Sequence, residues 1–280
     1  MTSRIETFHQ QDFQIRGYEV GPDGQVSLQS VFNYLVEAAS NHSVKLGVSL
    51  ADLFAQGQTW VLSRLHLQMD RFPTWPGKIR LETWPTGRQQ LYALRDLRLS
   101  LVDGPQLGVA CTSWMIIDLH TRRPTRIPDR YDEFVDPARG RTLPSEFQTL
   151  PRPERTDGEA TFLVRLSDLD LNRHVYAAHY LNWGIESIPE TVRQKCNLSE
   201  LEVAYRAECV YGDEVVACCQ VTEDGSGYQI IHNLHHADTG KEFTRLVTRW
   251  RPRQSGEAGT LCTDNIDHER FNSDQVRTEP

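Results

Sequence analysis

The sequence predicts an α+β fold in which a long helix packed on an antiparallel sheet occurs twice in tandem. Three observations support this prediction. An amphipathic helix pattern occurs once in each half of the 280-residue chain. Each helix is followed by segments with the alternation or the apolar run of β-strands. Short turns without helices separate these strands, which indicates an antiparallel meander with the helix lying on it.

The first half begins with a predicted strand at 13–20, where apolar and polar residues alternate. Residues 21–24 have the composition of a turn. A helix is expected from the N-cap residue Ser27 to about Leu46, because apolar residues recur on one helical face and Gly47 then supplies a stop. Four strands are predicted after this helix, at 60–70, 78–84, 92–101 and 109–118.

Proline is concentrated in the middle of the chain, where six of the 14 prolines lie between residues 121 and 160. Proline restricts the backbone and removes a hydrogen-bond donor, so this region is expected to connect two domains. The predicted regions are an N-terminal domain at 1–135, a linker at 136–158, a C-terminal domain at 159–253 and a flexible tail at 254–280.

The second half repeats the plan of the first. Its expected elements are a strand at 160–166, a helix at 175–188 and strands at 198–209, 214–222, 228–236 and 242–250. Landmarks recur at similar spacing: Tyr34 and Tyr180, Leu65 and Leu201, and Gly77 and Gly212. A repeat of this size indicates two similar subdomains, which is the plan of a double hot-dog protein.

Three polar residues precede the second helix at alternate positions, namely Asp170, Asn172 and His174. The start of a helix adds partial positive charge and unpaired N–H donors, which suit a carbonyl oxygen that is becoming an oxyanion. The alternative is that Asn172 only caps the helix and that His174 is structural. On this segment alone the structural interpretation is favoured.

Composition excludes several classes of protein. The net charge of -8 argues against general nucleic-acid binding. No apolar run is long enough to cross a membrane, and the N-terminus lacks the apolar region of a signal peptide, so a cytoplasmic protein is expected. The six cysteines show no spacing typical of a metal site, so buried, reduced thiols are expected: Cys111, Cys196, Cys209, Cys218, Cys219 and Cys262.

Several motifs, in order, are similar to those of one family. They are FQIRGYEV at 13–20, NH at 41–42, RFPTWPG at 71–77, Trp114, TRR at 121–123, DLDLNRH at 168–174, YLNW at 180–183 and YRAEC at 205–209. Through them the chain resembles the fatty acyl–acyl carrier protein thioesterases of plants and bacteria, over residues 11–252. Each motif alone is weak, but their order and spacing together are specific.

The resemblance implies hydrolysis of a long-chain acyl thioester on acyl carrier protein, releasing free fatty acid and ending fatty acid synthesis. It also implies that the C-terminal hot dog carries the catalytic residues while the N-terminal one shapes the acyl pocket. The reaction requires an activated nucleophile, a stabilised oxyanion and a path for the thiolate. It requires no metal and no organic cofactor.

Roles for the candidate residues follow as hypotheses. Asn172 and the start of the second helix would polarise the thioester carbonyl. Glu208, expected on the next strand, would activate water as a general base. His174 would position that water or move its proton. Asp170 would orient His174 or Asn172, or attack the carbonyl itself.

Cys209 offers a rival nucleophile, because Cys209, His174 and Asn172 have the composition of a papain-like triad. Strand alternation places Cys209 on the apolar face and Glu208 on the other face, unless a bulge reverses them. The commonest fate of such a cysteine is a small buried apolar side chain. We rank Glu208 above Cys209 on the pattern of the family.

The expected partner is an acidic acyl carrier protein, so basic docking residues are expected. Candidates are Arg122, Arg123, Arg126, Arg130, Arg249, Arg251 and Arg253. Neither nucleic acid nor a membrane is expected as a partner, and a monomer and a homodimer both fit the sequence. The alternative functions are an acyl-coenzyme A thioesterase, a hot-dog dehydratase or hydratase, and a non-catalytic acyl-binding protein.

Overall fold

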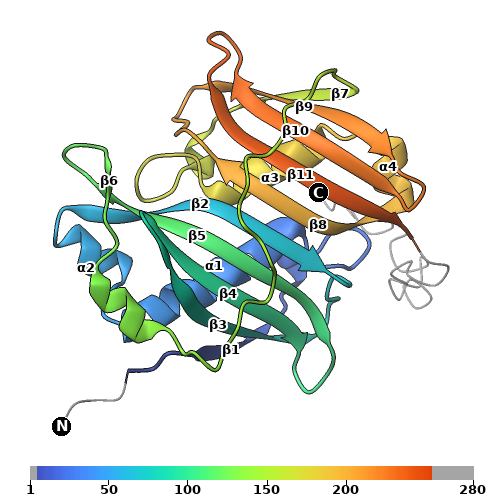
Figure 1. Ribbon diagram of the computed structural model, residues 1–280. Helices are drawn as coiled ribbons and strands as arrows, with labels where there is room; N and C mark the ends of the chain where they lie inside the picture. Colours follow the sequence, from blue (N-terminus) through green and yellow to red (C-terminus); the bar gives the residue numbers. More distant parts are fainter. Residues whose placement is uncertain (1–4, 254–280) are drawn as a thin grey trace, which may run out of the picture.

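A computed structural model describes residues 5–253, and its centre is one continuous antiparallel sheet (Figure 1). The strands run in the order β1-β3-β4-β5-β2-β8-β11-β10-β9-β7, and the short β6 pairs with β5. The predicted tail at 254–280 lies outside the described residues. In the described part of the chain no helix is both long enough and apolar enough to span a membrane.

The first half contains β1 (His9–Gln14), the 3-10 helix η1 (Gly17–Glu19), α1 (Leu28–Lys45), α2 (Leu50–Phe54), β2 (Gln58–Met69), β3 (Lys78–Gln89), β4 (Tyr92–Leu101), β5 (Gln106–Asp118), β6 (Pro124–Thr125) and η2 (Asp129–Phe134). The second half contains β7 (Gly158–Leu163), η3 (Leu166–Asp168), α3 (Ala177–Glu186), α4 (Glu190–Lys195), β8 (Cys196–Tyr205), β9 (Glu214–Glu223), β10 (Tyr228–His236) and β11 (Glu242–Pro252).

The two halves repeat one topology, which confirms the tandem α+β prediction. The first half has the strand order β1-β3-β4-β5-β2 and the second half has the equivalent order β7-β9-β10-β11-β8. The halves join where β2 pairs with β8, with Leu65 opposite Val203 and Leu67 opposite Leu201. These four side chains are buried, so the junction between the halves belongs to the hydrophobic core.

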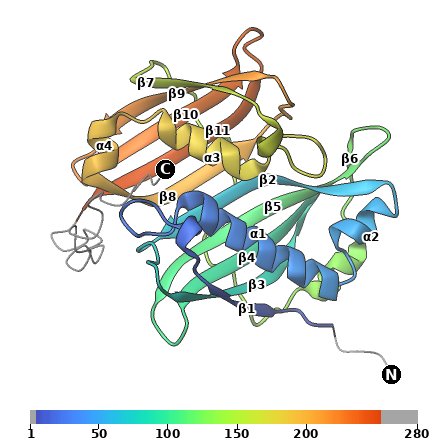
Figure 2. The same cartoon turned by 180° about the vertical axis from the view of Figure 1, so that it is seen from behind.

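Helix α1 has the bounds that local sequence signals predict. The Ser27 side chain accepts a hydrogen bond from the backbone N–H of Ser30, and the helix ends before Gly47, whose φ of +66° suits glycine. Its apolar stripe, including Val31 and Leu35, is buried against the sheet. Helix α3 covers the same face of the sheet in the second half, beside α1 (Figure 2).

The predicted strand at 13–20 is wrong beyond Gln14, because η1 interrupts it. A capping box causes the change: the Glu19 carboxylate accepts from the backbone N–H of Arg16 at 2.7 Å. The second half repeats the device with Arg165 and Asp168, where the N–H to carboxylate distance is 2.9 Å. Two charged residues three apart therefore end the strand in each half.

The repeated turns before α1 and α3 also correct one landmark. Bridges join Val20 to Val26 and, equivalently, Leu169 to Val175. Counting from these bridges, Tyr34 corresponds to Trp183. Its predicted equivalence with Tyr180 is therefore wrong by one helical turn.

The predicted strand at 198–209 ends early, at Tyr205, so Glu208 and Cys209 lie in the loop that follows β8. The carbonyl of Phe243 accepts from two successive N–H groups, those of Arg206 at 2.8 Å and Ala207 at 3.2 Å. A carbonyl shared in this way disrupts the ladder as a bulge does and turns the chain out of the sheet.

The connector between the halves crosses the face of the sheet opposite the helices (Figure 1). Thr142 donates to the buried carboxylate of Asp96 from its hydroxyl at 2.9 Å. Further along, Leu150 packs on Ala204 and Val247. The connector thus makes polar contacts with the first half and apolar contacts with the second.

Candidate active site

The turn before α3 is shaped by Asp170. Its Oδ1 accepts hydrogen bonds from the backbone N–H groups of Asn172 at 2.8 Å and His174 at 3.2 Å. Arg173 occupies the left-handed region at φ +61°, as a tight turn requires. Asp170 therefore holds the backbone of Asn172 and of His174, the two residues that the sequence hypothesis named as its partners.

The same turn in the first half has other residues at the positions of Asp170 and His174. Counting from the two bridges, Gly21 is equivalent to Asp170 and Gln25 is equivalent to His174. Asp23 occupies the position equivalent to Asn172, so the duplication retains the turn and a carboxylate in both halves but the imidazole in one.

His174 and Glu208 lie together although 34 positions separate them along the chain. The distance from His174 Nε2 to Glu208 Oε2 is 3.3 Å. A bridge between His174 and Val210 brings the two segments side by side, and the N–H of Val175 donates to the carbonyl of Cys209 at 2.9 Å. This backbone pairing is what places the acid beside the imidazole.

Arg122 completes this cluster from the other half of the chain, a role that sequence reasoning missed. Its guanidinium forms an ion pair with Glu208, and Nη2 lies 3.3 Å from Nε2 of His174. The sequence prediction placed Arg122 on a docking surface. One sequence signal could have indicated this position, because the TRR segment at 121–123 is among the motifs that resemble the family.

Cys209 lies next to this cluster in the chain but has the environment of a core residue. It has no exposed surface. Burial, followed by a hydrogen bond with Asp213, raises the pKa of its thiol to about 12. A nucleophilic cysteine needs a lowered pKa to form the thiolate, so this environment favours the structural interpretation of Cys209.

A cavity of about 1290 Å³ opens at the cluster and is lined by both halves. Asp170, Asn172, His174, Glu208 and Arg122 all contribute to its wall. The remaining wall is largely apolar and aromatic, and includes Phe32, Val36, Leu62, Trp114, Tyr176 and Tyr205. A cluster of polar groups on the wall of a large, mostly apolar cavity suits a ligand with a reactive head and a hydrocarbon chain.

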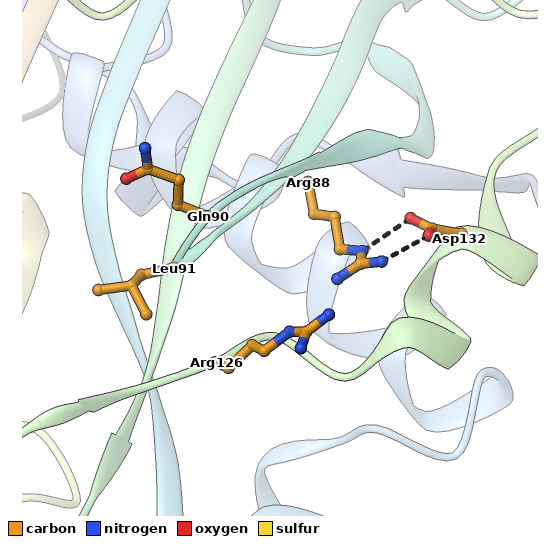
Figure 3. A pocket seen from close by; sticks show the side chains of 5 residues that line it. All are labelled: Arg88, Gln90, Leu91, Arg126 and Asp132. Carbon is orange, nitrogen blue, oxygen red and sulfur yellow. Dashed lines mark hydrogen bonds and ion pairs between the residues drawn. The ribbon is translucent and has the colours of Figure 1, made fainter.

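A second hollow lies on the first half, apart from the cluster (Figure 3). The Arg88 guanidinium donates to both carboxylate oxygens of Asp132, at 2.9 and 2.8 Å. This bidentate pair already satisfies the principal charges of the hollow, which is typical of a structural ion pair.

Asn41 and His42 of the first half make contacts within the N-terminal domain, where the Asn41 amide donates to Gln11 Oε1 at 2.9 Å. His42 is fully buried, and its Nδ1 lies 2.9 Å from Nη1 of Arg95. Its Nε2 donates to the carbonyl of Glu6 at 2.8 Å. Burial and then the Arg95 charge lower the pKa of His42 to about 3, so its ring is neutral at pH 7.

Within residues 5–253, one group of side chains has the spacing of metal ligands: His66, Glu200 and Glu202 at the β2–β8 junction. His66 Nε2 lies 2.7 Å from Glu200 Oε1, and Arg249 lies 3.3 Å from the other oxygen of Glu200. The carboxylate is thus already engaged by protein groups, which accounts for the cluster without a cation. The five cysteines in this part of the chain are free and buried, and Cys262 lies outside it.

Some predicted docking arginines are engaged elsewhere. Arg126 pairs with Asp129 at 2.7 Å, and Arg251 donates to the carbonyl of Met69 at 3.0 Å. Arg122 pairs with Glu208 beside His174. Arg123, by contrast, is exposed and its side chain makes no polar contact within the described residues.

Comparison with known proteins identifies the family. Residues 6–136 match the model of the acyl-ACP thioesterase N-terminal domain, and residues 152–252 match that of the C-terminal domain. A chloroplastic acyl-[acyl-carrier-protein] hydrolase of Cuphea viscosissima is 29% identical over 269 residues, covering 91% of this chain and 65% of its own length. A chloroplastic oleoyl-acyl carrier protein thioesterase of Arabidopsis thaliana is 27% identical, covering 88% of this chain and 77% of its own.

Solved structures agree with this result. The 12:0-ACP thioesterase from Umbellularia californica has a TM-score of 0.80 at 26% identity, covering 88% of this chain and 95% of the other. An acyl-ACP thioesterase from Bacteroides thetaiotaomicron shares the fold, with a TM-score of 0.79 and coverage of 89% and 100% at 23% identity. The chain spans about two thirds of the length of several curated relatives that it matches. The chain belongs to the acyl-ACP thioesterase family.

Proposed function

We propose that this protein hydrolyses the thioester of long-chain acyl–acyl carrier protein and releases free fatty acid. The observation that carries the proposal is the position of His174, Glu208 and Asn172 together on the wall of a large, mostly apolar cavity. Such a cavity accommodates an acyl chain while the polar groups face its thioester. The names of the similar proteins support this reaction, since they are acyl carrier protein hydrolases and thioesterases.

In the proposed mechanism, Glu208 accepts a proton from water as the water oxygen attacks the thioester carbonyl carbon. The tetrahedral intermediate then collapses, the carbon–sulfur bond breaks, and the thiolate of the carrier takes up the proton. His174 Nε2, 3.3 Å from the Glu208 carboxylate, is placed to hold the water or relay its proton. Bases positioned in this way contribute about 10²–10⁴-fold to a rate.

The oxyanion is assigned to Asn172 and the first turn of α3. The N-cap residue, Tyr176, supplies no side-chain hydrogen bond to that turn, so no side chain competes there for its N–H donors. We assign Asp170 a structural part, because its Oδ1 is already bound to two backbone N–H groups. That engagement disfavours Asp170 as the attacking group.

We expect Cys209→Ala to retain near wild-type kcat, because a buried thiol with a pKa of about 12 forms no useful thiolate at pH 7. Initial rates of thiol release at saturating substrate would measure this. A loss as large as that caused by replacing Glu208 would contradict it and restore Cys209 as the nucleophile.

We also propose that the N-terminal domain, with the predicted bounds 1–135, sets acyl-chain specificity. The apolar wall of the cavity supports this role, because Phe32, Val36 and Trp114 all come from the first half. The proposed catalytic domain at 159–253 supplies Asn172, His174 and Glu208, and the linker at 136–158 joins the two. A cytoplasmic location and a homodimer remain predictions.

A comparison of carriers tests the proposed substrate. We expect a higher kcat/KM on acyl carrier protein than on coenzyme A with the same acyl chain, because a protein carrier adds contacts outside the cavity. A preference for acyl-coenzyme A would assign the chain to that class of thioesterase. Tight acyl binding without thiol release from either carrier would identify a non-catalytic binding protein.

A further inference from the structure

Arg122 stands out in the catalytic cluster because it comes from the N-terminal half. We propose that Arg122 is a positioning residue that holds the Glu208 carboxylate beside His174 for hydrolysis. This inference rests on the proposed function. It adds to it the requirement that both halves of the chain contribute side chains to the reaction site. The residues are on the turn between β5 and β6, the loop after β8 and the turn before α3.

The contacts of the Glu208 side chain carry the first step. Within the described chain, its carboxylate has two polar partners, Arg122 and His174. The side chain is half exposed, at 49%. An exposed glutamate has considerable rotamer freedom, which a single imidazole contact at 3.3 Å restricts poorly. The guanidinium of Arg122 adds a second restraint with fixed donor geometry.

The turn that carries Arg122 is built to hold its position. Asp118 Oδ1 accepts from the backbone N–H groups of His120 at 3.0 Å and Thr121 at 2.7 Å, and from the Thr121 hydroxyl at 3.0 Å. The N–H of Arg122 donates to the carbonyl of Asp118 at 2.8 Å.

Backbone strain occurs at the same residue. Arg122 itself has a φ of +60°, a conformation that L-residues adopt at a cost. The Asp118 hydrogen bonds stabilise this conformation and direct the side chain from the N-terminal half towards the cluster.

The opposite side of the contact is also fixed. The N–H of Val210 donates to Asp213 at 3.0 Å, and the Cys209 carbonyl accepts from Val175. The backbone on both sides of the ion pair is therefore held by hydrogen bonds, so the interaction of Arg122 with Glu208 fixes one half of the protein relative to the other at the reaction site.

Surface charge gives a competing account of Arg122, because the sequence placed it with Arg123 among residues that dock an acidic carrier. The two accounts differ in kinetics. Loss of a docking charge raises KM for the carrier protein and leaves kcat unchanged. Loss of a positioning group lowers kcat, because displaced reacting groups slow the chemical step.

Arg123 provides the matched comparison. It follows Arg122 on the same turn and is exposed, and its side chain has no polar contact within residues 5–253. Arg123→Gln removes the same charge from the same surface without touching the Glu208–His174 contact. It therefore measures the effect of lost surface charge alone.

The experiment measures kcat and KM on acyl–acyl carrier protein for the wild type, Arg122→Gln, Arg122→Lys and Arg123→Gln. We expect Arg122→Gln to lower kcat about 10- to 100-fold with an unchanged melting temperature. Arg122→Lys should recover part of that loss, since lysine restores the charge but not the planar fork. Arg123→Gln should leave kcat at the wild-type value.

Two results would overturn the inference. One is an Arg122→Gln variant with both kcat and KM unchanged. The other is an Arg122→Gln profile with a change confined to KM and equal to that of Arg123→Gln, which would assign Arg122 to carrier docking. An inactive wild type would instead refute the proposed function, and the role of Arg122 would fall with it. Normal wild-type turnover with either overturning result refutes the positioning role alone.

Discussion

Glu208→Gln is expected to lower kcat for acyl–acyl carrier protein hydrolysis about 10²–10⁴-fold while the protein stays folded. The amide keeps the size of the carboxylate but accepts no proton from water. The side chain is half exposed, so its replacement leaves the hydrophobic core intact. Stopped-time measurement of free thiol at saturating substrate would give kcat, and circular dichroism would report the fold.

Glu214→Gln is a suitable control for this substitution. Glu214 starts β9, is exposed and lies outside the cavity wall. The Glu214→Gln variant should hydrolyse the substrate with the kcat of the wild type. Near-normal turnover by Glu208→Gln would remove Glu208 as the general base and return attention to Asp170 and Cys209.

The second large effect is on stability in acid. Lowering the pH from 7 to 4 is expected to reduce the free energy of unfolding by about 3 kcal/mol for each of two buried histidines. His42 and His232 have no exposed surface, and burial lowers the pKa of each to about 3. Between that value and about 6.5 the unfolded chain binds protons that the folded chain does not. Their contribution is therefore intact above pH 6.5 and is lost as the pH falls towards 3.

Urea unfolding at several pH values between 7 and 4 would measure this loss. His232→Gln should reduce the slope of stability against pH, because it removes one proton taken up on unfolding. His42→Gln should do the same independently. His120→Gln replaces an exposed histidine and should leave the slope unchanged. A stability independent of pH over this range in the wild type would contradict the neutral, buried state of both rings.

The elements that the sequence predicts well are those with local causes. Helix α1 begins after Ser27 and ends before Gly47, where the capping serine and the stop glycine place its limits. The predicted strand at 92–101 has the same bounds as β4, because alternation ends at a clear turn. The turn with Asp170, Asn172 and His174 was also found from sequence, since its residues are close in the chain.

The predicted elements that are wrong have one of two causes. Either a contact with a residue distant in the chain ends the element, or a second local motif competes with it. Alternation predicts a strand over 198–209, yet β8 ends at Tyr205. It ends there because the carbonyl of Phe243, distant in the chain, accepts hydrogen bonds from the backbone N–H groups of both Arg206 and Ala207. Alternation still predicted that Cys209 is buried and Glu208 is not. At 13–20 a capping box replaced the second half of a plausible strand.

Arg122 shows what no local pattern contains. Its contact with Glu208 exists because β2 pairs with β8 and joins the two halves into one sheet, which brings the turn after β5 to the loop after β8. From the sequence alone, an arginine in an Arg-rich loop is interpreted as an exposed surface charge. Only the arrangement of the two halves distinguishes it from its neighbour Arg123.

The central claim is most directly tested by incubating the purified protein with a long-chain acyl–acyl carrier protein and measuring thiol and fatty acid together. Hydrolysis predicts equal amounts of free fatty acid and free carrier thiol, formed over many turnovers by the wild type and strongly reduced in Glu208→Gln. Bound acyl chain without release of either product, or equal release by the wild type and Glu208→Gln, would contradict the account.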